Sequence, residues 1–146
     1  MKIKIKRFDK SIPLPQYEKR DFRPACFDFK ARLDVTVAPK TISMVPLNTA
    51  IEVPEGYAMM FYVRSSTPMR KGLMAASSVG ILDAFFCGDK DENIFPVYNF
   101  TDTEVTVKKG DHIVQAMLIK VENVEFEEVD HMEHAGVGGY VVPPRE

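Results

Sequence analysis

One carboxylate stands in an unusual apolar setting in the middle of the chain. Asp83 lies between the aliphatic residues 79–82, VGIL, and the aromatic pair Phe85 and Phe86. Burying an unpaired carboxylate is costly, so such a residue is normally solvated at a turn, paired with a donor, or kept for chemistry such as proton abstraction. The bland interpretation is a turn Asp in a hairpin, and the other motifs must decide between the two.

A second group of residues suits phosphate oxygens. Arg64, Ser65 and Ser66 are consecutive and place a guanidinium beside two hydroxyls, after an apolar segment and before Pro68. The competing interpretation is a helix start in which a serine caps the helix and the Arg64 side chain is solvated. Taken alone, the triplet favours that alternative.

Two later motifs could serve the same chemistry. Residues 110–115, GDHIVQ, predict a turn that enters a strand, with His112 at the surface or at an interface and Gln115 as a polar side chain among apolar neighbours. Residues 136–140, GVGGY, form a glycine-rich loop whose backbone at Gly138 could wrap a polyphosphate while the Tyr140 ring stacks on a base. A plain tail is the alternative for this second motif.

Composition limits the classes of function. At 146 residues, 45% hydrophobic and 27% charged, the chain predicts a single core domain. A formal net charge of −2 argues against a general nucleic-acid binder. The sequence has no apolar run near the roughly 20 residues of a membrane span and no signal-peptide core after its basic start, so we expect a cytoplasmic protein without a membrane partner. Cys26 and Cys87 form no metal motif and are expected to be free thiols.

The elements that must position these residues are mostly strands. Alternating polar and apolar residues predict strands at KIKIK near the start, at 31–37, at Tyr57–Val63 and at 103–110, and ten prolines and eight glycines separate the strands. The pattern indicates an all-β barrel or two-sheet fold. The best helical segment, residues 65–74, is limited to a turn or two by Pro68 and Gly72. The glycines and prolines of residues 134–146 predict a flexible C-terminal arm after a β domain at 1–133.

The order of the motifs resembles the trimeric dUTPase family almost from end to end. The resemblance rests on Ala25-Cys26-Phe27-Asp28, on RSS at 64–66, on GILD at 80–83 with Phe86, on GDHIVQ at 110–115 and on GVGGY at 136–140. It implies the β-clip, or distorted jelly-roll barrel, of that family. It also implies a homotrimer in which each active site is assembled from several chains and closed by the arm.

The chemistry implied by the resemblance is hydrolysis of dUTP to dUMP and pyrophosphate. In this family the residue matching Asp83 orients and deprotonates the water that attacks the α-phosphorus, while Mg²⁺ chelated by the phosphates neutralises developing charge. The residue matching Asp28 belongs to the water shell of that metal.

The binding roles carry over in the same way. Phe86 takes the place of a family Tyr beneath the deoxyribose and would exclude a ribose 2′-hydroxyl. Backbone groups around Gly80 would read uracil. The remaining substrate-binding positions implied by the resemblance are Arg64, Ser65, Ser66 and Gln115 for the phosphates, and Gly138 and Tyr140 in the arm.

The sequence also departs from the family pattern. Ala135 stands where the family has an Arg that clamps the γ-phosphate, with His134 and Arg145 as nearby substitutes. Ser66 replaces a Gly, and about three extra residues between Gly88 and Asn99, in the polar run DKDEN, lengthen a hairpin.

Two alternatives therefore stay open. One is a related dCTP deaminase-type enzyme, for which Glu92 would be the nearest candidate acid. The other is a weakened dUTPase-fold protein that binds nucleotides or regulates a partner.

Overall fold

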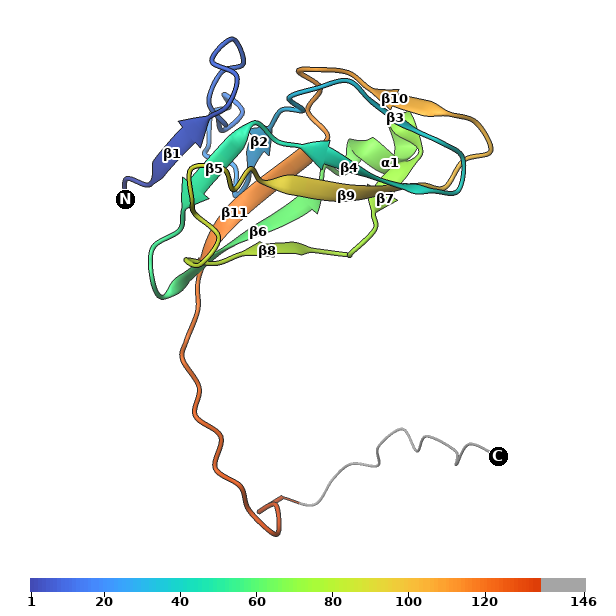
Figure 1. The fold of residues 1–146 in the computed structure, drawn as a ribbon. Helices are drawn as coiled ribbons and strands as arrows, with labels where there is room; N and C mark the ends of the chain where they lie inside the picture. The colour runs from blue at the N-terminus through green and yellow to red at the C-terminus, as the bar shows by residue number, and fades with distance from the viewer. Residues whose placement is uncertain (135–146) are drawn as a thin grey trace, which may run out of the picture.

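Short antiparallel strands make up nearly all of the regular secondary structure of the described chain, with a single short helix among the described residues. The structure is a computed structural model and describes residues 1–134. Its elements in chain order are β1 Lys4–Arg7, β2 Phe27–Phe29, β3 Val35–Val37, β4 Ile42–Pro46, β5 Thr49–Glu52, β6 Tyr57–Val63, α1 Ser66–Lys71, β7 Leu73–Ala75, β8 Gly80–Leu82, β9 Ile94–Asn99, β10 Val105–Val107 and β11 Val114–Lys120. They form four sheets, in the orders β1-β5, β10-β3, β2-β11-β6-β8 and β4-β9-β7 (Figure 1). The prediction of an all-β fold is confirmed, although the strand pairings do not close into a single barrel.

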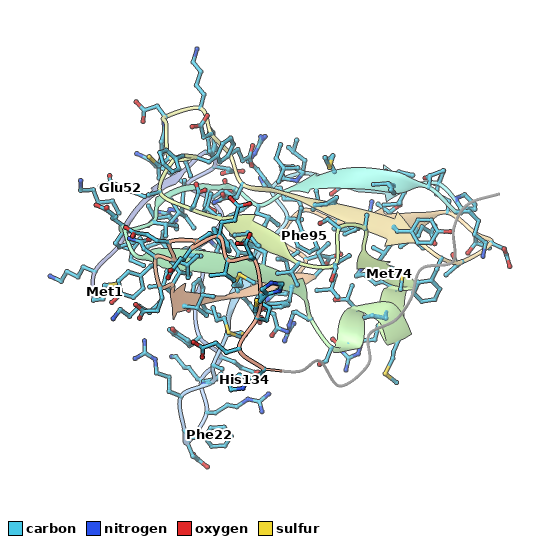
Figure 2. All side chains as sticks on the ribbon, turned by 90° about the horizontal axis from the view of Figure 1, so that it is seen from below. Met1, Phe22, Glu52, Met74, Phe95 and His134 are labelled. Carbon is cyan, nitrogen blue, oxygen red and sulfur yellow. The ribbon has the colours of Figure 1, made fainter. Side chains whose placement is uncertain are left out.

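The core lies between the two larger sheets. Phe29 and Phe61 face inward from the four-stranded sheet, with ring centroids 5.1 Å apart, and Phe95 and Val97 face them from the three-stranded sheet. Figure 2 shows the Phe95 side chain near the centre of the body. Strand residues alternate between the faces of a sheet, so each inward aromatic leaves its neighbours on the outer surface, where the candidate site is built.

The predicted elements are present, most of them shorter than predicted. The strand Tyr57–Val63 has its predicted bounds, whereas the one predicted at 31–37 begins only at Val35. Just before this strand the Asp34 side chain accepts hydrogen bonds from the Lys109 backbone N–H and from Lys108 Nζ, which ties it to the segment that follows β10. Helix α1 lies within the predicted segment 65–74 and has the predicted length of a turn or two. It ends at Lys71, and Gly72 follows it with a φ of 64°, where a Cβ would meet Thr101 Cγ2.

The lengthened hairpin is tied to the body by a partly buried ion pair. Both carboxylate oxygens of Glu92 accept hydrogen bonds from the Arg32 guanidinium at 2.7 Å, and Glu92 Oε1 also accepts one from the backbone N–H of Asn48. The Glu92 and Arg32 side chains are only 11% and 28% exposed. The hydrogen bonds that Arg32 donates to Glu92 raise the pKa of Arg32 further above its ordinary value. This pair fixes the base of the loop that follows the Asp83 hairpin.

We expect Glu92→Gln to lower the free energy of unfolding by about 3 kcal/mol, because it leaves the Arg32 charge without its partner in a site largely withdrawn from water. Urea denaturation at a fixed protein concentration measures the effect. Glu52→Gln is the matched control, since the Glu52 pair with Lys4 is exposed and should contribute less than about 1 kcal/mol. Equal losses in the two variants would contradict a special role for the Arg32 pair.

The chain leaves the body after β11. Val121 N donates the last backbone hydrogen bond to the body, to Gly56 O, and residues 122–134 then run away from it as an exposed segment (Figure 1).

No helix within residues 1–134 is long and apolar enough to cross a membrane. The division into a domain at 1–133 and an arm at 134–146 stays a prediction, because residues 135–146 lie outside the described part.

Candidate active site

Asp28 and Arg64 meet at one end of the four-stranded sheet. Arg64 follows the last residue of β6, and Asp28 is the central residue of β2, one strand beyond β11 in the sheet order. Arg64 Nε lies 3.2 Å from Asp28 Oδ1, and the two side chains are 30% and 15% exposed. Arg64 is therefore not simply solvated, as the helix-start interpretation required.

Ser65 stands at the start of α1 with its hydroxyl uncommitted to the helix. Ser65 occupies the N-cap position of α1 with φ −52° and ψ −32°, and its side chain makes no capping hydrogen bond. Thr67 N donates to Arg64 O, so the first turn is tied back through the backbone. The hydroxyl of Ser65 is thus left available, as phosphate binding would require.

Gln115 completes this group. It pairs in register with Asp28 across the β11–β2 ladder, and its Nε2 donates to Val63 O at 3.3 Å. A hollow of about 300 Å³ is lined by Glu18, Arg20, Pro24, Ala25, Cys26, Asp28, Arg64, Ser65, Ser66 and Gln115. The structure therefore brings four sequence-predicted binding residues and Asp28 to one concave site.

Cys26 lies in the wall of this hollow, and its thiol is unreactive as a nucleophile. Burial, with a smaller contribution from the Asp28 charge, raises the pKa of the Cys26 thiol above its ordinary value. The thiol therefore stays protonated near neutral pH and is a poor nucleophile. Both cysteines are free, as the sequence predicted.

Asp83 lies at the turn that follows β8. Its side chain is exposed, and Oδ1 accepts a hydrogen bond of 2.9 Å from the backbone N–H of Phe85. Oδ2 accepts no hydrogen bond within residues 1–134. The carboxylate is thus fixed through one oxygen and open at the other. An Asp can follow this apolar run because the turn holds its side chain at the surface and not among the aliphatic side chains.

Gly80 and Phe86 lie beside an apolar hollow next to that turn. Gly80 pairs with Phe61 in the β6–β8 ladder, and a Cβ added to it would come within 3.2 Å of Phe61 Cβ and 3.5 Å of the Phe95 ring. The Phe86 ring is 47% exposed and lines the hollow of about 120 Å³ together with Gly80 and Phe95. A flat, mostly apolar group such as a base or sugar suits this surface.

The two groups of residues are well separated within one chain. Leu82 pairs with Met59 on β6, so Asp83 is level with Ala58, whereas Arg64 lies six residues further along, directly after the end of β6. At about 3.3 Å per residue this is roughly 20 Å. One chain cannot therefore bring Asp83 and Arg64 to the same phosphoryl group.

The hollow lined by Asp28, Arg64, Ser65 and Gln115 is called the phosphate-type hollow below. Sequence reasoning missed several residues around it. The loop before β2 contributes Glu18 and Arg20, for which no sequence motif gave a signal. His112 is 38% exposed, in keeping with its predicted surface position, yet its Nδ1 lies 3.4 Å from Asp28 Oδ2. That contact follows from the β2–β11 pairing, which a single sequence does not reveal.

Asp111, next to His112, has a structural task. Burial raises its pKa, but hydrogen bonds from Lys71 Nζ at 2.8 Å and from the Lys108 backbone N–H at 2.9 Å outweigh burial and leave the pKa below its ordinary value. Asp111 thus stays ionised and ties the turn before β11 to the end of α1.

The two predicted substrate-binding residues of the arm, Gly138 and Tyr140, lie outside the described residues.

The acidic residues suit a hydrated metal rather than a protein cage. Within residues 1–134 no three His, Cys, Asp or Glu side chains lie together as a set of direct ligands. Asp28 and Glu18 do line one hollow. Mg²⁺ commonly keeps several waters and is held by one or two carboxylates plus substrate phosphates, which this arrangement fits.

The chain resembles several known proteins over most of its length. The SPbeta prophage-derived deoxyuridine 5′-triphosphate nucleotidohydrolase YosS of Bacillus subtilis is 35% identical over 142 residues, which cover 96% of each chain. A mutant Staphylococcus bacteriophage 80alpha dUTPase with dUpNHpp has a TM-score of 0.79 at 17% identity and covers 93% of this chain and 92% of its own. A mutant dUTPase of phage phi11 of S. aureus, with a structural Mg(II) ion, has a TM-score of 0.78 at 16% identity, covering 92% and 100%.

These likenesses agree with the order of motifs and with the arrangement of the sheets. The two phage structures share the fold at low identity, whereas the B. subtilis protein is related through its sequence over nearly the entire chain. The dUTPase family model matches residues 10–140, which include every motif considered above. The chain therefore belongs to the dUTPase family.

Proposed function

We propose that this protein is a dUTP diphosphatase that hydrolyses dUTP to dUMP and pyrophosphate. The observation that carries the proposal is the carboxylate of Asp83, fixed through Oδ1 by the Phe85 N–H and open at Oδ2 beside an apolar hollow, in a chain of the dUTPase family. A positioned carboxylate of this kind can orient a water and take its proton.

The remaining roles follow from where the side chains lie. Oδ2 of Asp83 would accept the proton of a water directed at the α-phosphorus, and the Phe86 ring would pack beneath the deoxyribose. Arg64, Ser65, Ser66 and Gln115 would donate hydrogen bonds to phosphate oxygens from the other hollow. We also propose that Gly138 and Tyr140 contact the substrate.

Mg²⁺ is the proposed cofactor, with Asp28 accepting hydrogen bonds from its water shell. Bound with the triphosphate, Mg²⁺ would neutralise the charge that develops on the phosphate oxygens. The support comes from the acidic residues of the hollow and from the Mg(II) ion of the phi11 relative.

A homotrimer with shared sites is proposed because one chain separates the two halves of the site by roughly 20 Å. The outer face of the β4-β9-β7 sheet supports association. Ile42, Met44, Met74 and Ile94 on that face are 44–61% exposed. An exposed apolar surface of this kind marks a contact with another chain.

The deaminase alternative is less well supported. Its candidate acid, Glu92, is held on both oxygens by Arg32 and on one also by Asn48 N, so it is committed to the fold. The regulatory alternative gains no support from Asp83, whose open oxygen is suited to proton abstraction.

The two free thiols, Cys26 and Cys87, agree with a reducing compartment, and we propose the cytoplasm as the site of action.

The direct test is pyrophosphate release with Mg²⁺ from dUTP, dCTP, dTTP and UTP, each assayed separately. The proposal expects release from dUTP alone at a substantial rate. Ammonia release from dCTP would instead support the deaminase alternative, and no turnover of any nucleotide would support the binding-protein alternative.

Phe86→Ala should weaken the selection against ribonucleotides. Removing the ring opens space beneath the sugar, so we expect the ratio of kcat/KM for dUTP to that for UTP to fall by about tenfold or more. Phe85→Ala is the control, because the Phe85 side chain is 94% exposed and does not line the hollow. A ratio that Phe86→Ala leaves unchanged would show that another group excludes the 2′-hydroxyl.

A further inference from the structure

The phosphate-type hollow contains a second arginine–carboxylate pair besides Arg64 and Asp28. Arg20 Nε and Nη2 both donate to Glu18 Oε2, at 3.1 and 2.7 Å. Both residues line the same hollow as Arg64, Ser65 and Gln115. The hollow thus holds two guanidinium groups, each paired with a carboxylate.

The loop that carries Arg20 is held against the site at both ends. Asp28 N donates to Gln16 O at 2.9 Å, which places residue 16 beside β2, and the loop returns directly into β2 through Cys26. The Tyr17 ring packs edge-on against Phe27 at 5.3 Å and carries the Arg23 guanidinium over its face at 4.4 Å. Figure 2 shows Phe22 pointing away from the body at the tip of this loop. Arg20 is therefore presented to the hollow by an anchored loop rather than by a free end.

The two pairs differ in how easily they can be opened. The Arg20 and Glu18 side chains are 54% and 52% exposed, whereas those of Arg64 and Asp28 are 30% and 15% exposed. An exposed ion pair contributes little to stability, so exchanging its carboxylate for a phosphate costs little. Hydrogen bonds between a guanidinium and phosphate oxygens are charge-assisted and can be bidentate.

We propose that Arg20 is a triphosphate-binding residue that exchanges Glu18 for phosphate oxygens when the nucleotide binds. The inference rests on the proposed function and adds a residue to its site. Glu18 holds the guanidinium in place before the nucleotide binds and competes with the phosphates for it. Removal of Arg20 and removal of Glu18 should consequently change nucleotide affinity in opposite directions.

The first test compares Arg20→Gln with Arg23→Gln by calorimetry, using a non-hydrolysable imido analogue of dUTP with Mg²⁺, and dUMP. Arg23 is the matched control because it belongs to the same loop, lies on Tyr17 and does not line the hollow. We expect Arg20→Gln to raise the Kd of the analogue by about tenfold and that of dUMP by less than about twofold. Arg23→Gln should leave both within about twofold.

The second test compares Glu18→Gln with Asp21→Asn in EDTA, where no metal screens the triphosphate. Each change removes one negative charge from the loop, but Asp21 does not line the hollow. Glu18→Gln should lower the Kd of the analogue by about threefold or more, and Asp21→Asn should lower it less. A damaged loop would weaken binding in both, so tighter binding in Glu18→Gln separates competition from a structural role.

The outcomes are distinguishable from those for the proposed function. If the unmodified protein binds the analogue tightly while Arg20→Gln matches Arg23→Gln, the inference is wrong and the proposed function stands. Equal weakening of the analogue and dUMP by Arg20→Gln would also overturn it. If the unmodified protein binds no deoxyuridine nucleotide, the proposed function fails and the inference fails with it.

Discussion

Asp83→Asn is expected to lower kcat for dUTP hydrolysis by about 10³-fold while nucleotide affinity changes by less than about threefold. An Asn side chain keeps the oxygen that accepts the Phe85 N–H, so the turn retains its geometry. An amide cannot take a proton from water, whereas a carboxylate can. The loss should consequently appear in turnover and not in the Kd of a non-hydrolysable analogue.

Asp91→Asn is the matched control for this change. Asp91 also fixes a turn, because its Oδ2 accepts a hydrogen bond of 2.7 Å from the backbone N–H of Gly88. Steady-state kinetics and calorimetry on both variants separate chemistry from turn stability. If the two substitutions reduced kcat equally, Asp83 would be a turn residue only and the general-base role would be wrong.

Mixing two inactive variants should restore activity. Arg64→Gln removes the proposed phosphate contact and takes the guanidinium partner away from Asp28, so we expect kcat/KM to fall by about 10²-fold. Asp83→Asn is expected to be nearly inactive for the reason given above. If a site takes Asp83 from one chain and Arg64 from another, mixed trimers refolded from equal amounts contain intact sites, and about one quarter of the original activity should return.

The geometry gives this experiment a clear alternative. Were Asp83 and Arg64 of the same chain to form the site, every site in a mixed trimer would carry one of the two substitutions, and mixing would restore nothing. Refolding each variant alone is the control for recovery from denaturant. Light scattering on the mixed sample checks that trimers are present, since a monomer that hydrolyses dUTP would also contradict a shared site.

The sequence predicted this protein's fold class and most of the candidate site because those features are local. Alternation of polar and apolar residues identified the strand Tyr57–Val63, and a residue free to adopt positive φ marked the end of α1 at Gly72. The spacing of RSS, GILD and GDHIVQ carried the resemblance to the dUTPase family, which the match over residues 10–140 confirms. A turn for Asp83 was among the interpretations, and the structure joins it to an open carboxylate oxygen.

The tertiary structure alone decided which charges meet. Pairing of β2 with β11 places Asp28 beside Arg64 and His112, residues 36 and 84 positions away in the chain. The loop before β2 brings Glu18 and Arg20 to the same hollow, although no sequence motif predicted that they would belong to the site. Strand register, finally, separates Asp83 from Arg64 by roughly 20 Å on one chain. Contacts of this kind depend on which strands pair and in what register, and a single sequence constrains pairing only weakly because alternation specifies a face and not a partner.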